Sequence, residues 1–243
     1  YFKDGFAMQL GGGGASLCAA KYIKEKMYAQ KITASYGVGG STGIFVGMVE
    51  EGLVSKLYDT QSFDTTAIAS LKNNPKHIEV SASYYASCGN KGPIINNLDA
   101  VILGATEVDV NFNVNTLTGS NGTFMGAIGG HADIAATAGL SMVVLPLFRG
   151  RFPVIRPAVR TITTPGETID VIITERGIAV NPRRKELLAN LQAANLPLIS
   201  IEELQRMSYK IAGTPEDVPD GDKVVALVEY RDGSILDTVR SKA

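Results

Sequence analysis

A stretch of small residues around a single histidine, GAIGGHADIAATAG at Gly126–Gly139, is the segment best suited to chemistry. Glycine has no Cβ, so the pair Gly129 and Gly130 lets the backbone approach a bound molecule closely. A backbone amide aimed at a developing oxyanion stabilises it by about 2.7 to 4 kcal/mol. His131, which follows the pair, can carry a proton near neutral pH. The stretch predicts a catalytic turn formed by Gly129, Gly130 and His131. The alternative is a plain helix start with an exposed His131 and with Asp133 at the positive end of the helix dipole.

Two further glycine-rich stretches follow apolar runs. LGGGGAS at Leu10–Ser16 opens a helical pattern, so the amides of Gly11, Gly12, Gly13 and Gly14 could bind a phosphate, a thioester oxygen or a carboxylate. SYGVGGSTG at Ser35–Gly43 is interpreted as the turn after the next strand. Turns after successive parallel strands share one edge of the sheet, where ligands bind in open α/β folds. Tight bends without a ligand are the alternative. The dinucleotide fingerprint is incomplete at Ser16, and no Walker lysine follows.

The elements that would position these turns alternate along the chain. Apolar runs predict strands, a 3.6-residue period predicts helices, and their alternation indicates an α/β fold with buried strands. The predicted strands include Phe6–Leu10, Lys31–Ser35, Ala100–Leu103, Val108–Phe112, Leu140–Leu147, Ile169–Ile173 and Lys223–Tyr230. Helices are predicted over Ala15–Tyr28 and Lys185–Ala194, and from Ser200, which has Glu203 three residues later as in a capping box. Without a repeat or a long linker, residues 1–243 are expected to form one domain.

Composition narrows the possible partners. The 243 residues are 45% hydrophobic and carry a net charge of −1, so no overall field attracts nucleic acid or a membrane surface. No apolar run reaches about 18 residues, and Cys18 and Cys88 are too few for a disulfide framework. We expect a cytoplasmic protein with Cys88 as a buried thiol and His77 at the surface. No spacing of His, Cys, Asp or Glu predicts a metal site.

Taken together, these segments resemble a known family. The order of LGGGGASLCAAKYI, ITASYGVGGSTG, LDAVILGATEVDVNFNVN, GAIGGHADIA and TPGETIDVIITERGIAV is similar to the C-terminal half of CoA-transferases, and most closely to the α subunits of bacterial citrate lyases. The resemblance implies an open sheet of mixed or parallel strands with flanking helices, of the CoA-transferase type. It also implies an active site between two homologous halves. The N-terminal half is then expected to be absent from this chain, which begins abruptly at Tyr1.

One departure from the family separates this chain from many of its members. Many CoA-transferases carry a nucleophilic glutamate in the turn after the second strand, but here Ser35–Gly40 contains no carboxylate. A glutamyl-enzyme intermediate is therefore not expected, and Glu50 and Glu51 lie too far along, on a predicted helix. The incoming acid must attack the acyl thioester itself, in a ternary complex. Tyr36, which replaces the carboxylate, is predicted to contact substrate together with Ser35, Gly37, Gly39 and Gly40.

The resemblance implies exchange of acetate for citrate on a CoA-like, phosphopantetheine-type group of an acyl carrier protein, or on acetyl-CoA. Its implied partners are the carrier and lyase subunits of citrate lyase, in an oligomer. Bidentate arginine suits citrate carboxylates. The candidates are Arg149, Arg151, Arg156, Arg160 and Arg176, with Asn113, Asn115, Ser120 and Asn121 as a polar wall; Arg176 and Asn113 are favoured. The alternatives are a transferase or hydrolase for another short acid, a carrier-docking module and, more remotely, a nucleotide-binding dehydrogenase.

Overall fold

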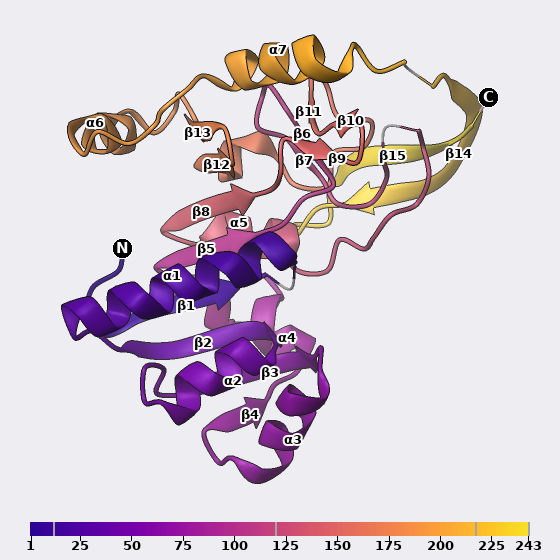
Figure 1. Cartoon of the computed structure of the whole chain (residues 1–243). Coiled ribbons are helices and arrows are strands. Elements are labelled where there is room, and N and C mark those ends of the chain that lie inside the picture. The colour runs from indigo at the N-terminus through magenta and orange to yellow at the C-terminus, as the bar shows by residue number, and fades with distance from the viewer. Residues whose placement is uncertain (12, 120, 217, 243) are drawn as a thin grey trace. The chain divides into compact units, whose positions relative to one another are not determined.

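The computed structural model describes residues 1–11, 13–119, 121–216 and 218–242 and divides into two compact units. Unit 1 comprises Tyr1–Gly104 and Thr137–Ser141, and unit 2 comprises Ala105–Ala136 and Met142–Ala243 (Figure 1). In Figure 1, unit 1 runs from indigo to magenta and most of unit 2 runs from magenta to yellow. Within the described residues, no helix has both the length and the apolar character of a membrane span.

Unit 1 is built around parallel strands, as the alternating pattern predicted. Their order is β5-β1-β2-β3-β4, and every neighbouring pair is parallel. The strands are β1 (Phe6–Leu10), β2 (Ala34–Ser41), β3 (Leu57–Ser62), β4 (His77–Glu79) and β5 (Ala100–Leu103). The helical segments are α1 (Gly14–Gln30), α2 (Gly43–Glu50), α3 (Thr65–Asn73), α4 (Ala82–Ala86) and the 3₁₀ turn η1 (Ile94–Asn97). The predictions of β1, α1 and β5 are confirmed.

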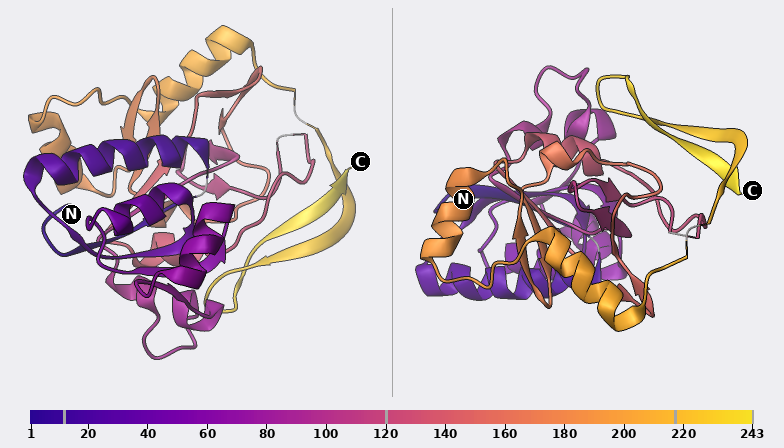
Figure 2. Two further views of the ribbon diagram at one scale, coloured as in Figure 1. Left: turned by 60° about the horizontal axis from the view of Figure 1, so that its bottom comes forward. Right: turned by 90° about the horizontal axis from the view of Figure 1, so that it is seen from above.

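The strand order places the helices. From β1 to β4 each strand pairs with the next in sequence, and right-handed crossovers then put α1, α2 and α3 on one face of the sheet. Figures 1 and 2 show α1 and α2 lying side by side over this face. The chain returns to the other side of β1 at β5. The strand order therefore reverses between β1 and β5, and the crevice at such a point is where open α/β sheets bind ligands.

The predicted turn at Ser35–Gly43 is wrong, because most of this stretch is the central strand β2. Its glycines make room for aromatic rings: a Cβ on Gly37 would lie 2.3 Å from the ring of Phe45, and one on Gly40 would lie 2.0 Å from that of Phe63. Gly39 has a φ of +113°, at an irregularity in the β2–β3 register. Ring packing from α2 and from the chain before α3 thus overrides the poor strand propensity of glycine.

Two predictions of exposure are also wrong. His77, predicted at the surface, is 4% exposed because β4 places it on the buried side of the sheet, and its Nε2 lies 3.3 Å from Asp59 Oδ2. Burial lowers the pKa of His77 and outweighs the raising effect of Asp59. Cys88, predicted as a buried thiol, is exposed, since it lies in the loop that follows α4.

Asp64 joins the N-termini of two helices. Its Oδ1 accepts a hydrogen bond from the Ala67 amide of α3 at 2.8 Å, and its Oδ2 accepts one from the Gly43 amide of α2 at 2.7 Å. These amides hold the pKa of Asp64 below its usual value. The side chain therefore connects the N-termini of α2 and α3 at the carboxyl edge of the sheet.

Replacement of Asp64 by alanine is expected to destabilise the protein by about 0.5 to 2 kcal/mol, because it removes both caps. Because the native pKa is lowered, the stabilising contribution is complete above the ordinary pKa and is lost as the pH falls through the native value. Urea unfolding of wild type and Asp64→Ala should therefore differ at pH 7 and converge in acid. Asp64→Ser, which can cap only one helix, should fall between them; a difference that persists in acid would contradict this origin.

Unit 2 contains three small sheets, strands β12 (Val171–Thr174) and β13 (Gly177–Val180), and most of strand β8 (Leu140–Val144), whose first two residues belong to unit 1. Strands β8 and β12 are parallel, and β13 is antiparallel to β12. A second group has the order β11-β6-β7, from Ile155–Arg156, Glu107–Asp109 and Val114–Asn115. The other strands form the hairpins β9–β10 (Phe148–Arg149, Phe152–Pro153) and β14–β15 (Asp220–Glu229, Ile235–Lys242). Its helical segments are α5 (His131–Thr137), η2 (Gly166–Thr168), α6 (Lys185–Ala193) and α7 (Ile201–Ala212).

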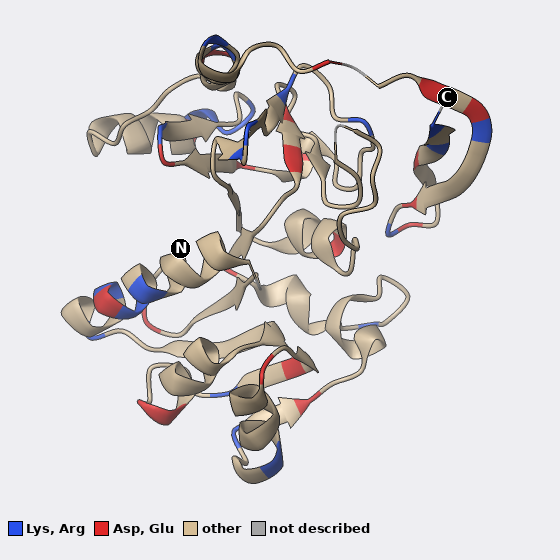
Figure 3. Cartoon of the chain, turned by 45° about the vertical axis from the view of Figure 1, so that its right-hand side comes forward, with Lys and Arg blue, Asp and Glu red and all other residues tan. Residues whose placement is uncertain are grey.

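Most of the predicted elements of this unit are confirmed, but the predicted strand Val108–Phe112 is wrong beyond Asp109. The chain turns there, and the Phe112 amide donates to the Asp109 carbonyl at 2.9 Å. The chain leaves β8 before Pro146, and α6 and α7 occupy their predicted positions. The Ser200 hydroxyl accepts the Glu203 amide at 3.1 Å, which confirms the predicted helix cap. Strand β14 was predicted, but its partner β15 was not. Both acidic and basic residues occur along their hairpin (Figure 3).

Candidate functional site

The glycine-histidine stretch forms a turn that leads into α5. Gly129 has a φ of +54°, which favours glycine, and the Gly130 carbonyl accepts the first helical hydrogen bond, from Ile134 N at 3.0 Å. Among the described residues, no acceptor receives the amide of Gly129 or of Gly130. The turn therefore presents two backbone donors next to His131 in the sequence, and its predicted catalytic role stays a prediction.

His131 is held inside the unit. Its side chain is buried, with the residue only 8% exposed, and Nδ1 lies 2.7 Å from the Thr164 hydroxyl. The backbone of Thr164 is fixed in turn, because its carbonyl accepts the Val114 amide at 3.0 Å. An exposed His131, the alternative considered above, is therefore excluded. The Thr164 contact fixes the direction of the ring.

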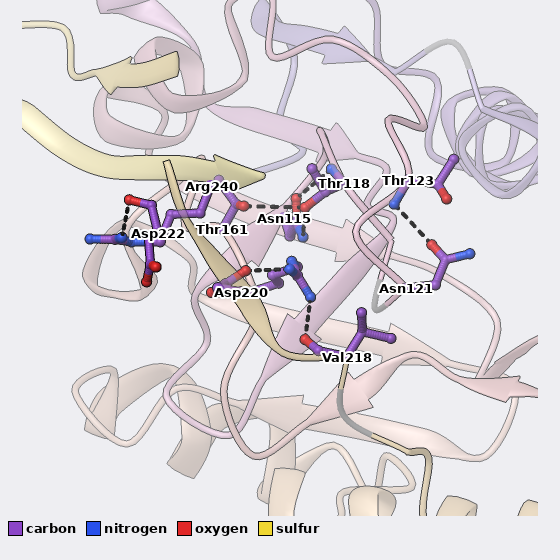
Figure 4. Close-up of polar contacts among 10 residues, drawn as sticks. Asn115, Thr118, Asn121, Thr123, Thr161, Val218, Asp220, Asp222 and Arg240 are labelled. Atoms are coloured by element: carbon purple, nitrogen blue, oxygen red, sulfur yellow. Dashed lines mark hydrogen bonds and ion pairs between the residues drawn. The ribbon is translucent and has the colours of Figure 1, made fainter. Parts of the chain in front are cut away.

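A network of buried hydroxyl and amide groups supports this region (Figure 4). The Asn115 side chain donates to the Thr118 hydroxyl at 3.0 Å, and that hydroxyl donates to Thr161 at 3.2 Å. The Thr163 hydroxyl accepts the Thr116 amide at 3.0 Å. Buried polar groups joined in this way specify one arrangement of the two segments that they connect. Asn115, predicted as polar wall, is therefore part of the internal support.

The tip of the β14–β15 hairpin contacts α5. Arg231 Nε lies 3.6 Å from Asp133 Oδ1, and the two side chains are 20% and 24% exposed. Burial raises the pKa of Asp133, against the lowering effect of Arg231. Asp133 belongs to the same stretch as Gly129 and His131, so Arg231 contacts the helix that follows the predicted catalytic turn.

In unit 1, the first glycine-rich stretch lies where the strand order reverses. The Gly11 amide donates to the Ile102 carbonyl of β5 at 2.8 Å, and a Cβ on Gly11 would lie 3.0 Å from that oxygen. Gly13 is the N-cap residue of α1, so no side chain occupies the cap position of this helix. Ser16, in the first turn of α1, is fully buried, and its hydroxyl has no partner among the described residues. The predicted anion site therefore stays a prediction, at the N-terminus of α1 and beside the point where the strand order reverses. Gly12 lies outside the described residues.

The β2 candidates are partly engaged within unit 1. The Ser35 hydroxyl donates to the Phe6 carbonyl at 3.2 Å, and the Tyr36 hydroxyl donates to the Ile94 carbonyl at 2.9 Å. Burial raises the pKa of Tyr36 to about 12, and the nearby Asp99 adds to this effect. Tyr36 is therefore a neutral phenol at physiological pH.

Tyr36→Phe is expected to destabilise the protein by about 0.5 to 1.5 kcal/mol, the usual value of one hydrogen bond. Because the native pKa is raised, the stability that Tyr36 contributes is complete below the ordinary value near 10 and is lost as the pH rises toward 12. Denaturant midpoints of wild type and Tyr36→Phe should therefore converge as the pH rises from about 10 toward 12. Tyr22→Phe, at an exposed position on α1, serves as the control; a constant difference between wild type and Tyr36→Phe would contradict the assignment.

The side chains of Asn113 and Asn121, two polar candidates of unit 2, form hydrogen bonds within the unit. Both side-chain polar atoms of Asn113 are engaged: Nδ2 donates to Asp109 at 3.1 Å, and Oδ1 accepts the Gly166 amide at 2.9 Å. Asn121 accepts the Thr123 amide at 3.0 Å (Figure 4). Ser120 lies outside the described residues.

The five arginines do not form one cluster in unit 2. Arg156 is buried, whereas Arg160 pairs with Asp220 and donates to the Val218 carbonyl, which ties the β14–β15 hairpin to the unit (Figure 4). Arg151 and Arg176 are exposed. Arg149 donates from Nη2 to the Ala105 carbonyl at 2.9 Å.

Arg149 also lines a cavity of about 210 Å³ in unit 2, together with Glu107 and Asn121. The sequence analysis singled out Arg149 and Asn121 but not Glu107, and it could not place the three together, because Glu107 lies in β6, Arg149 in β9 and Asn121 in a loop between other strands. It missed Thr164 and Arg231, for which the sequence carries no local signal. Among the described residues, no three His, Cys, Asp or Glu side chains converge to hold a metal ion.

Comparisons with known proteins agree on the family. Residues 1–242 match the family model for the citrate lyase alpha subunit. The citrate lyase alpha chain of Klebsiella pneumoniae is 50% identical over 240 residues, which cover 99% of this chain and 47% of the relative. A crystal structure described as the alpha subunit of citrate lyase from Streptococcus mutans, in complex with citrate, has a TM-score of 0.97 and 47% identity. It is matched over 100% of this chain and 48% of that one.

A more distant structure shows the fold class. The 4-hydroxybutyrate CoA-transferase of Porphyromonas gingivalis has a TM-score of 0.52 at 18% identity, over 73% of this chain and 44% of that chain. The fold is therefore of the CoA-transferase type, as the resemblance implied. The chain spans about half the length of the curated relatives that it matches. It belongs to the citrate lyase alpha subunit family.

Proposed function

We propose that this chain is part of an acyl transferase that exchanges acetate for citrate on the thioester of an acyl carrier protein. The observation that carries the proposal is the identity of about 50% with citrate lyase alpha chains along nearly the whole chain. The citrate bound to the Streptococcus mutans relative supports citrate as the acid. The proposed setting is the cytoplasm, in a complex with a lyase subunit and the carrier.

The proposed reaction has two acyl transfers. In the first, a citrate carboxylate attacks the acetyl thioester carbon, the carbon–sulfur bond breaks, and a mixed anhydride and a thiolate form. In the second, the thiolate attacks the citryl carbonyl of the anhydride and acetate leaves. The attacking carboxylate is already ionised near neutral pH, so the chemistry depends on orientation and oxyanion stabilisation. No carboxylate stands in Ser35–Gly40, which supports direct attack by the acid rather than a glutamyl intermediate.

The residue roles follow the geometry within each unit. In unit 2, the amides of Gly129 and Gly130 serve as oxyanion donors, and His131 donates a hydrogen bond to the same charge. In unit 1, the turn Gly11–Gly14 binds a further phosphate of the CoA-like group at the start of α1. Ser35, Tyr36, Gly37, Gly39 and Gly40 contact substrate. Arg176 is the proposed carboxylate ligand, since its side chain is exposed. Asn113 acts by holding Asp109 and Gly166 in place.

Mass spectrometry of the carrier thiol tests this function. A full-length alpha chain that contains this sequence is incubated with acetyl-carrier and isotope-labelled citrate. Labelled citryl-carrier with stoichiometric acetate is the expected result. Free thiol with acetate would indicate a hydrolase, and an unchanged acetyl-carrier would indicate a docking module or another acid. Thr164→Val should slow the exchange because it releases His131, whereas Thr164→Ser, which keeps the hydroxyl, should restore it.

A further inference from the structure

The cavity beside Arg149 lies between two loops of unit 2. One is the segment that carries Asn121 and Met125, and the other is the β9–β10 hairpin, which carries Arg149 and Phe152. Its volume is about 210 Å³, and Glu107 also lines it. The first loop closes on itself, because the Gly119 amide donates to Thr123 O at 2.9 Å and the Met125 amide to Leu117 O at 2.8 Å. The cavity is therefore a built feature of this unit.

The walls of the cavity are apolar and accessible. Phe152 is 63% exposed and Met125 is 50% exposed, although both are large hydrophobic side chains, and the adjacent Phe124 is also exposed. Val154 adds to the apolar lining. Large apolar side chains left in contact with water around a concave surface mark a place where a ligand binds.

The polar groups limit what that ligand can be. Arg149 is an exposed guanidinium whose position is fixed by its hydrogen bond to the Ala105 carbonyl, so it can meet an anion such as a phosphate. Among the described lining residues, Arg149 is the one basic residue, and Glu107 is a buried acidic residue. Citrate, with three carboxylates, fits this distribution poorly. A neutral chain of methylenes and amides that ends in one phosphate fits it well.

We propose that this cavity, lined by Glu107, Met125, Arg149 and Phe152, binds the phosphopantetheine arm that carries the acyl group. The proposal rests on the transferase function above. Met125 lies four residues before Gly129, so an extended chain separates their Cα atoms by at most about 14 Å. The arm would lie along the Met125 loop, with its thioester directed toward the amides of Gly129 and Gly130.

Direct binding tests the cavity separately from turnover. The full-length alpha chain is titrated calorimetrically with 4′-phosphopantetheine and with pantetheine, which lacks the phosphate. Arg149→Gln is expected to weaken binding of phosphopantetheine about tenfold and to leave pantetheine unchanged. Phe152→Ala should weaken both ligands, because the apolar wall is lost. Arg206→Gln removes an exposed arginine of α7 and is the control.

The outcomes are distinguishable from those of the transferase assay. Equal binding of phosphopantetheine by wild type, Arg149→Gln and Phe152→Ala overturns the cavity proposal, even if citrate exchange proceeds. Displacement of the probe by citrate in a manner that depends on Arg149 overturns it as well, since the cavity is then the acid site. If the substitutions weaken binding of phosphopantetheine but the wild type shows no citrate exchange, the cavity proposal is supported and the proposed transferase function is refuted. Free coenzyme A and the carrier protein both contain a phosphopantetheine arm. The ligand that binds with the higher affinity is the acyl donor.

Discussion

Replacement of Gly129 by alanine is expected to lower the rate of citrate exchange by about 10² to 10³, with only a small loss of stability. Gly129 has a φ of +54°, where an alanine is strained by about 1 to 2 kcal/mol. No atom lies within 4 Å of the added Cβ, so the substitution causes no clash. The strain is relieved by rotation of the turn, which moves the amides of Gly129 and Gly130 away from the thioester oxygen. Carrier mass spectrometry under single-turnover conditions measures the rate.

Gly52→Ala is the matched control for this prediction. Gly52 follows α2, has a φ of +78° and is equally free of neighbours around a Cβ. The two substitutions therefore carry the same type of backbone strain, but only one lies at the proposed oxyanion site. Equal exchange rates for the two variants would refute the role of the Gly129 turn.

Gly166→Ala is expected to have the largest effect on stability, about 3 kcal/mol or more. The reason is space rather than backbone conformation: a Cβ there would lie 2.0 Å from the Asn111 carbonyl oxygen and 2.8 Å from the Asn113 amide nitrogen. These are backbone atoms and cannot rotate away. The Gly166 carbonyl also accepts Asn181 Nδ2 at 2.9 Å, so any shift breaks a buried hydrogen bond. Urea denaturation measures the free energy of unfolding.

Gly92→Ala provides the comparison for this second prediction. Gly92 lies in a surface loop with no atom within 4 Å of a Cβ, and its φ is outside the left-handed range. Its substitution should change the free energy of unfolding by no more than about 0.5 kcal/mol, the range typical of surface changes. A Gly166→Ala variant as stable as Gly92→Ala would show that the Asn111 loop can move aside.

The sequence predicts those elements whose own residues carry the signal. Phe6–Leu10 is a continuous apolar run and forms the buried strand β1, and Ser200 with Glu203 marks the start of α7. Strand β2 could not be predicted in the same way. Its glycines disfavour a strand locally, and only the rings of Phe45 and Phe63, supplied by later segments, make them suitable.

The same distinction applies to the candidate site. The positive φ of Gly129 and the helix that follows it were foreseeable, because glycine pairs before a helix have a local meaning. The Thr164 contact that buries His131 joins segments far apart in the chain. Arg231 contacts Asp133 from the tip of a hairpin whose second strand was not predicted. Tertiary pairings of this kind leave no trace in spacing or composition.

The Arg231–Asp133 contact has a consequence for biosynthesis. A ribosome makes Gly129, His131 and Asp133 long before it makes the β14–β15 hairpin, so helix α5 emerges without the guanidinium that later faces it. Until that hairpin docks, Asp133 lacks the positive charge of Arg231 that faces it in the finished protein. The ion pair that flanks the proposed oxyanion turn therefore forms only after the β14–β15 hairpin has been translated.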